Sequence, residues 1–330
     1  MPNARSFLPA TTGLFAHALI LALALTILSH SARANDQPRV AIVAAATNTA
    51  DAQTAPRYTD PRDKILATGF FSGVDIIDTT PFGTGVPTLE ELLAYDAVIT
   101  WSNASYEDAV AMGDVFADYV DAGGGVVVAI FANTSTHPQR FLQGRWQTGD
   151  YIAIPQNGGF SEGPGELGSI LIPDHPILDG VQTFVTRWGV TSQGAIFGGY
   201  RPTITAVTPG STKVALWDTG HTLIALAPNP NVVELGFHPV SSDVNANAYW
   251  DADTDGDRIM ANALLFVARE KASCPADLDG DGSVGSSDLS ILLGCWGQAS
   301  GLCAVADLTG DDLVGSADLS ELLGSWGPCN

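Results

Sequence analysis

Residues 276–289 read ADLDGDGSVGSSDL, and the pattern returns 30 residues later as ADLTGDDLVGSADL at residues 306–319. Each copy runs on through a Leu-Leu-Gly to a Trp-Gly pair, at Trp296 and Trp326. Self-similarity at a fixed period marks repeated copies of one structural unit. The repeat therefore predicts that the tail of the chain contains two equivalent units, each a polar loop followed by a short helix.

The polar loops carry oxygen-bearing side chains at the spacing of a calcium site. An EF-hand loop binds Ca²⁺ through positions 1, 3, 5, 7, 9 and 12, with a glycine at the turn in position 6. The first loop supplies Asp277, Asp279, Asp281, the Ser283 carbonyl, a water at Gly285, and Asp288, with Gly282 at the turn. The second supplies Asp307, Thr309, Asp311, the Leu313 carbonyl and Asp318.

The second loop departs from the pattern twice, because Thr309 replaces an acid and Asp312 replaces the turn glycine. We expect both loops to bind Ca²⁺, the second more weakly, and Val284 at position 8 to pair with the other loop. The alternative is an acidic, glycine-rich tail that is only solvated.

This tail resembles the type I dockerin family over residues 274–329, where 277–293 and 307–323 match the family's loop and helix start. The resemblance implies a small all-α double EF-hand-like module. It also implies docking to a cohesin-like or cell-surface protein, usually on behalf of polysaccharide-degrading enzymes. The Trp-Gly endings and the cysteines are not required by the family's pattern, so a different attachment module remains an alternative.

The N-terminus has the features of a secretory signal over residues 1–34. Arg5 precedes an apolar run, and Ala32-Arg33-Ala34 forms a small-residue cleavage site. A membrane anchor is the alternative, but the run is short for a span. We expect a secreted or cell-surface protein without a membrane span after cleavage. The net charge of −22 argues against a nucleic-acid partner.

Export makes a disulfide frame the natural interpretation of the four cysteines, which all lie in the last 57 residues. Three pairings are possible. We favour Cys274–Cys329, which ties the ends of the module, together with Cys295–Cys303 between the repeats.

Residues 35–271 alternate between strand and helix patterns and predict a domain separate from the tail at 272–330. Strands are expected near 40–46, 74–78, 97–101 and 126–131, and later near 213–217, 222–227 and 232–237. Helices are expected near 60–70, 89–95, 106–122 and 257–269. Short links between alternating elements predict an α/β fold with a flavodoxin-like, doubly wound, mostly parallel sheet.

This region resembles the class I glutamine amidotransferase-like superfold, especially its trehalose-utilisation-like branch. The resemblance rests on the segments YDAVITW (95–101), YVDAGGGVV (119–127), DHPI (174–177), GFHP (236–239) and GDRIMANALL (256–265). It implies the sheet rather than an activity. Residues 35–273 contain no cysteine, and the elbow position reads Phe131-Ala132-Asn133. Cysteine-dependent glutaminase chemistry is therefore excluded.

A ligand of a doubly wound sheet binds at the carboxyl ends of its strands. The candidate side chains there are Trp101, Ser102, Asn103, Asn133, His137 and His238. Such aromatic and amide groups suit a carbohydrate, and packing of the sheet rim is the alternative. Ser135 as a nucleophile is disfavoured because no Gly-x-Ser-x-Gly elbow surrounds it.

Two further acidic features are open to a functional interpretation. Glu162 and Glu166 are the candidate catalytic carboxylates if the domain is a hydrolase. Residues 251–257, with Asn262 at position 12, imitate a calcium loop but also precede a helix, where acids are favourable.

Three hypotheses follow for the whole chain. In the first, the α/β domain is a non-catalytic binding or structural module attached by the tail. In the second, it is a hydrolase of O-glycosyl compounds in polysaccharide catabolism. In the third, it is part of an interaction protein whose only specific chemistry is calcium-dependent assembly. The missing nucleophile favours the first and third.

Overall fold

The first strand shows why the central sheet is buried on both faces. In β1 (Arg39–Ala44), Val40, Ile42 and Ala44 enter one apolar cluster, and Ala41 and Val43 enter another. Side chains alternate between the two faces of a strand, so a continuous apolar run feeds two cores. The computed structural model describes residues 37–190, 196–197, 199–244, 249–268, 275–279 and 283–328.

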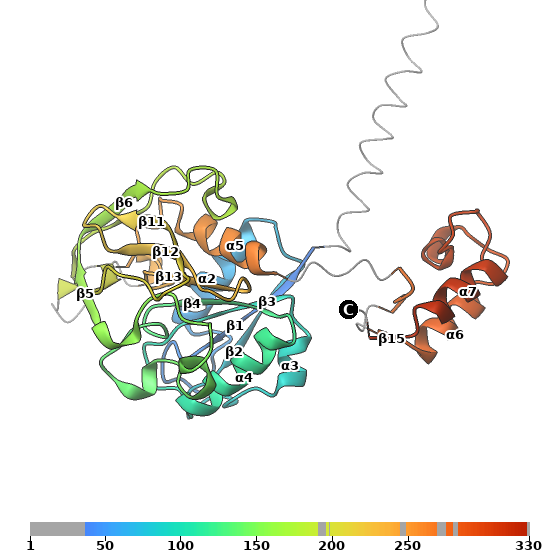
Figure 1. The fold of residues 1–330 in the computed structure, drawn as a ribbon, viewed down its shortest axis with the longest axis horizontal. Helices are drawn as coiled ribbons and strands as arrows, with labels where there is room; N and C mark the ends of the chain where they lie inside the picture. Colours follow the sequence, from blue (N-terminus) through green and yellow to red (C-terminus); the bar gives the residue numbers. More distant parts are fainter. Residues whose placement is uncertain are drawn as a thin grey trace, which may run out of the picture.

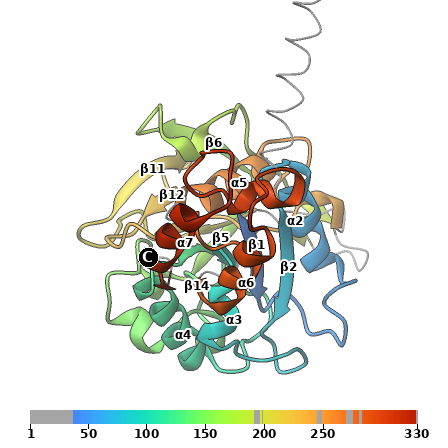
Figure 2. The ribbon, with the colours of Figure 1, turned by 90° about the vertical axis from the view of Figure 1, so that its right-hand side faces the viewer.

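Helices cover both faces of the sheet in this half of the domain (Figures 1 and 2). Helices α2 (Pro56–Ala67) and α5 (Gly256–Val267) contribute to the cluster around Ile42. Helices α3 (Leu89–Leu93) and α4 (Ala109–Asp121) contribute to the cluster around Val43. The predicted α/β class is thus confirmed as three layers.

The large sheet has the strand order β2-β1-β3-β4-β13-β12-β11-β6-β7 in the described residues. Its strands are β2 (Gly73–Asp78), β3 (Ala97–Thr100), β4 (Gly125–Ala129), β6 (Gly165–Ile170), β7 (Val185–Thr186), β11 (Thr212–Trp217), β12 (Thr222–Leu226) and β13 (Val232–Leu235).

Only the first half of that order is parallel, so the expectation of a mostly parallel sheet needs correction. Pairs from β2 through β1, β3 and β4 to β13 are parallel, whereas those from β13 to β7 are antiparallel. Turns at 218–221 and 227–231 join β11 to β12 and β12 to β13. Segments this short cannot carry the crossover that a parallel pair requires.

Four other strands of the α/β domain form small ribbons in the described residues: β5 (Phe160–Gly163) pairs with β10 (Gly199–Pro202), and β8 (Gly189–Val190) pairs with β9 (Ile196–Phe197).

The predicted helices exist, but two begin at other residues than expected. The helix expected from 106 begins at Ala109, because the Asp108 carboxylate accepts from the N–H groups of Val110 and Ala111 and caps it. The helix expected from 60 begins at Pro56, since proline is favourable in the first turn. In the part of the chain that the structure describes, no helix is both long and apolar enough to cross a bilayer.

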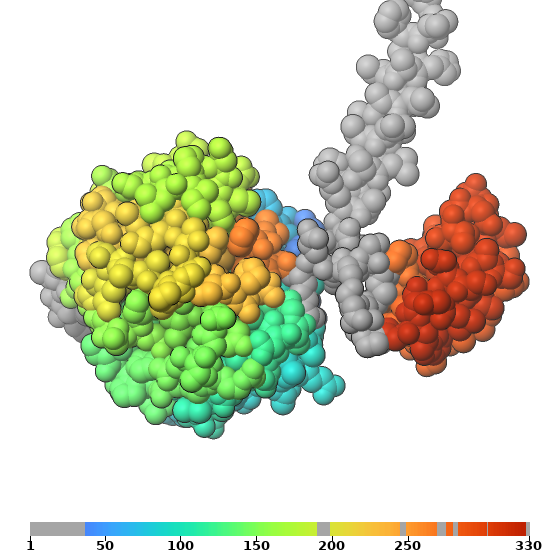
Figure 3. Space-filling model, in the orientation of Figure 1, coloured from blue at the N-terminus to red at the C-terminus, as the bar shows by residue number. Residues whose placement is uncertain are grey.

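The tail, whose surface is orange and red in Figure 3, packs around a core of its own. Its helices are α6 (Ser286–Gly294) and α7 (Ser316–Gly324), with a 3-10 helix at Gly301–Ala306 between them. This core contains residues related by the repeat, such as Val284 and Val314, or Leu292 and Leu322. A short pairing of β14 (Ser283–Val284) with β15 (Gly327–Pro328) means that the tail is not purely helical.

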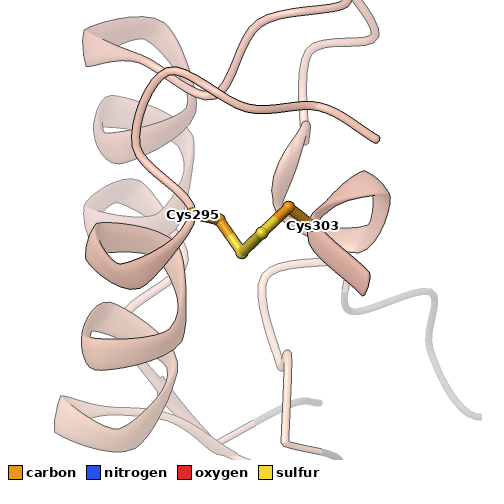
Figure 4. The surroundings of a disulfide bond; sticks show 2 residues. All are labelled: Cys295 and Cys303. Atoms are coloured by element: carbon orange, nitrogen blue, oxygen red, sulfur yellow. A yellow bond between two sulfur atoms is a disulfide. The ribbon is translucent and has the colours of Figure 1, made fainter. Parts of the chain in front are cut away.

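The Cys295–Cys303 disulfide is present, as Figure 4 shows, with Cα atoms 5.2 Å apart. It joins the end of α6 to the 3-10 helix. The other favoured pair, Cys274–Cys329, lies outside the described residues, as does the predicted signal at 1–34.

Candidate functional sites

Each tail loop gathers three carboxylates at one point. One carboxylate oxygen from each of Asp277, Asp279 and Asp288 lies within 4.8 Å of the other two. Asp307, Asp311 and Asp318 form the equivalent group in the second loop. Negatively charged carboxylates at this separation repel one another, and a divalent cation between them would remove the repulsion. Asp281 falls outside the described residues.

The residue at position 12 organises each loop from inside. Asp288 is buried, and its Oδ1 accepts from the N–H groups of Leu278 (2.7 Å) and Asp279 (3.1 Å). Its Oδ2 accepts from the N–H of Gly285 at 2.7 Å, at the start of α6. Burial acts to raise the pKa of the Asp288 carboxyl, but these backbone donors prevail and hold that pKa below its ordinary value.

Asp318 repeats this arrangement with one change. Its Oδ1 accepts from both the N–H (3.0 Å) and the hydroxyl (2.9 Å) of Thr309, and its Oδ2 accepts from the N–H of Gly315. Burial again opposes these donors, which hold the pKa of Asp318 below its ordinary value. The Thr309 hydroxyl, a candidate ligand oxygen, therefore also serves to hold the position-12 carboxylate.

The turn of the second loop shows the effect of the missing glycine. Asp312 has φ of 65°, the left-handed region that favours glycine. The Asp307 carboxylate accepts from the N–H groups of Gly310, Asp311 and Asp312, which draws the backbone around it. The Leu313 N–H donates to the Asp311 Oδ1 at 2.9 Å. The loop holds its turn with an aspartate in a strained conformation.

The expectation that Val284 pairs with the other loop is wrong, because its partner lies in the Trp-Gly ending of the second repeat. Val284 pairs with Gly327, and the Val314 carbonyl accepts from the N–H of Gly297 at 2.8 Å. Both glycines have positive φ and follow the repeat's tryptophans. Each Trp-Gly ending thus places a backbone group against the opposite loop, which gives the repeated dipeptide a structural reason.

In the α/β domain, the predicted ligand residues lie at the carboxyl edge of the parallel strands. Trp101, Asn133 and His238 are buried there, just after β3, β4 and β13. Backbone bonds from Phe131 to Ser102 and from Ile130 to Phe237 tie these strand ends together. The elbow after β4 therefore carries Asn133 inward, where its Nδ2 donates to the carbonyls of Leu235 and Val128.

Three of these buried side chains keep a polar atom without a partner among the described residues: Trp101 Nε1, Asn133 Oδ1 and His238 Nε2. A buried polar atom left unpaired is costly, so such a group calls for an explanation.

Asn103 is only half buried, with its backbone N–H bonded to Ala45. His137 is exposed, and its Nδ1 accepts from Gln139 to start a 3-10 helix. The Ser135 hydroxyl accepts from the N–H of His137 within the same turn.

The other acidic candidates have different tasks. Glu162 and Glu166 are exposed on β5 and β6. Asp251 forms an ion pair with Arg187, and Asp255 accepts from two backbone N–H groups at residues 182–183. Asn262 turns its amide to carbonyls of Ile177 and Asp179. Asp255, at the start of α5, and Asn262, within it, thus bind the backbone of residues 177–183 and fix the helix there, while Asp251 is paired with Arg187.

Sequence patterns missed the groups that surround His238. Arg57, Arg140, Tyr200 and Tyr249 reach it from four separate segments. No sequence motif indicates these four residues, because they come together only in the folded chain.

Comparison with known proteins adds little to this geometry. No protein-family model and no curated protein match the chain. Among solved structures, a ThuA-like protein from Bacteroides uniformis is similar over 72% of this chain and 93% of its own, at 14% identity and a TM-score of 0.40. A ThuA-like protein from Parabacteroides merdae gives 70% and 90% coverage, 12% identity and a TM-score of 0.37. Values this low support no argument about activity.

Proposed function

We propose that this chain is an exported calcium-binding protein whose dockerin-type tail attaches it to a partner protein. The α/β domain is its cargo, an amidotransferase-like module that binds a ligand without cysteine-dependent catalysis. The observation that carries the proposal is the repeated carboxylate triad in the two tail loops.

The donor set suits Ca²⁺ in particular. It consists of oxygens from Asp277, Asp279 and Asp288, and of the repeat-related acids of the second loop, with no nitrogen or sulfur donor among the described groups. Hard oxygen donors select Ca²⁺ or Mg²⁺, and the twelve-residue spacing with flexible loop carbonyls favours the larger ion. Bound Ca²⁺ would neutralise the triad and couple folding of the tail to binding.

The attachment role is supported by apolar side chains on the tail surface. Leu293 and Trp296 are 51% and 48% exposed, and Leu323 and Trp326 repeat them at 52% and 50%. Exposed apolar groups of this size are typical of binding surfaces. The four residues occupy equivalent places in the two repeats, so each repeat offers the same surface to a cohesin-like or cell-surface partner.

Calorimetry of the chain with Ca²⁺ tests the first part of the proposal. Asp277→Ala should weaken binding more than Thr309→Ala, because it removes a carboxylate where the other change removes a neutral hydroxyl. Equal effects, or an absence of binding heat in the unsubstituted chain, would overturn the calcium role.

A cohesin binding panel tests the second part. Binding should occur in Ca²⁺, disappear in EGTA, and disappear in a Leu293→Glu, Leu323→Glu double variant. Leu66→Glu is the control, since Leu66 is 43% exposed on the α/β domain. Binding that survives the double variant would place the docking surface elsewhere.

A further inference from the structure

An aromatic cluster stands at the carboxyl edge of the sheet, outside the tail. We call it the His238 cluster, and it consists of Phe131, Phe160, Tyr200, His238 and Tyr249. Phe131 contacts Phe160 and Tyr200 with ring centroids 4.5 and 4.9 Å apart, and Tyr249 stacks on His238 at 4.8 Å. Phe160, Tyr200 and Tyr249 are half buried, so part of each ring is exposed beside the buried Phe131 and His238.

His238 forms that base with an unused donor. The side chain is 2% exposed, and its Nδ1 accepts from the N–H of Val240 at 3.4 Å. Burial, with Arg57 and Arg140 nearby, holds the pKa of His238 well below its ordinary value, so the ring is neutral. The proton of a neutral ring that accepts at Nδ1 sits on Nε2. That Nε2 has no hydrogen-bond partner among the described residues.

Two arginines flank the cluster. An Arg57 guanidinium nitrogen donates to the Tyr249 hydroxyl at 2.5 Å, and the guanidinium carbon lies 5.6 Å from that ring's centroid. The Arg140 guanidinium carbon lies 6.0 Å from the centre of Phe131, and its Nε is buried without a partner in the described structure.

These arginines differ from most others in their lack of a carboxylate. The chain has 36 acidic and 14 basic residues, so acids are abundant. Ion pairs are formed by Arg39, Arg62, Arg145, Arg187 and Arg258. Within the described ranges, neither Arg57 nor Arg140 has such a pair. Glu162 lies opposite Tyr200 in the β5–β10 ribbon but is exposed.

We propose that the His238 cluster binds a carboxylate carried on a ring, as in an aryl acid or a sugar acid. The proposal rests on the binding role proposed for the α/β domain and names its ligand class. The guanidinium groups of Arg57 and Arg140 suit a carboxylate, because a guanidinium carries positive charge and a planar set of donors that a carboxylate can accept from. The His238 Nε2–H supplies a further donor, and the exposed parts of the Tyr200 and Tyr249 rings pack against the ligand's ring.

Calorimetry of the full chain in EGTA tests this with benzoate and D-glucuronate as probes. At least one acid should bind, and its neutral analogue, benzyl alcohol or D-glucose, should bind about tenfold more weakly or worse. Acetate and inorganic phosphate should also bind at least about tenfold more weakly, because they lack the ring. Whichever acid binds more tightly identifies the source of the carboxylate.

Substitutions then locate the site. Arg57→Gln and Arg140→Gln should each weaken binding of the acid about tenfold or more. Arg62→Gln is the matched control, since Arg62 is on the same helix and pairs with Asp63. Glu162→Gln should strengthen binding, because it removes the neighbouring negative charge.

Four results would overturn the proposal. They are no binding of either acid at about 10 mM, a concentration that detects even a weak site; equal binding of the neutral analogues; equal binding of acetate or phosphate; or no effect of the two arginine substitutions. The test runs without Ca²⁺, so its failure leaves the calcium role of the tail untouched. Failure of the calcium titration, in turn, leaves this result standing.

Discussion

Replacement of Asp288 by asparagine should loosen the tail even without calcium. The carboxylate accepts three backbone N–H groups, from Leu278, Asp279 and Gly285. An asparagine amide retains one acceptor oxygen, so its NH₂ group must face one set of donors. Losing one charge-assisted bond and leaving a buried donor unpaired costs about 2–3 kcal/mol.

That loss is large for a module of this size, since small domains have only a few kcal/mol of stability to begin with. Hydrogen exchange of the full chain, read over residues 283–328, measures it directly. Amide protection in the tail should fall by about thirtyfold or more, while protection in the α/β domain stays unchanged. Asp318→Asn should act alike on the second repeat.

The pH dependence follows from the same contacts. The pKa of Asp288 is lowered in the folded tail, so its contribution is present above the ordinary aspartate pKa of about 3.9 and is lost as pH falls below it. Loss of protection should therefore set in below about pH 4 in the unsubstituted chain. Unchanged tail protection in Asp288→Asn at neutral pH would refute the reasoning.

Three other outcomes are expected. Asp312→Gly should raise the stability of the calcium-free tail by about 1 kcal/mol, because glycine adopts the positive φ of this position without strain. Gly310→Ala should lower that stability, because Gly310 also has positive φ, although an added Cβ would meet no other atom there. Amide protection of the tail in hydrogen exchange measures both changes. Glu234→Gln should leave the denaturant midpoint of unfolding unchanged at about pH 4.5 but raise it at about pH 9. Burial raises the pKa of Glu234 to about 8, so ionisation of the wild-type carboxyl destabilises the folded state as pH rises above about 4.3, by about 3–5 kcal/mol at most. Identical chemical-denaturation curves for the two at the higher pH would contradict this. The chain should release no ammonia from glutamine, since residues 35–273 lack a cysteine; measured turnover would disprove it.

The parallel half of the fold was open to prediction from the sequence. The apolar run at Val40–Ala46, the Gly-Gly-Gly stop after α4 and the Thr88 cap each act locally, and the Thr88–Glu91 capping box is present. The antiparallel half was also implied by the four- and five-residue links at 218–221 and 227–231, which leave no room for a crossover.

The candidate site of the α/β domain could be predicted only in part. The strand-end rule located Trp101, Asn133 and His238, because the edge follows from the strand order. Arg57 and Tyr249 lie 192 residues apart in the chain, and no periodicity links them. In the tail, the repeat identified the loops, but the partner of Val284 depended on how the Trp-Gly endings fold back.

Native mass spectrometry of the full chain, titrated with Ca²⁺, tests the central claim most directly. We expect two bound ions, the first filled at lower concentration than the second, and none in an Asp288→Asn, Asp318→Asn double variant. A chain that takes up no calcium, or a double variant that retains both ions, would contradict the assignment of the two tail loops as calcium sites.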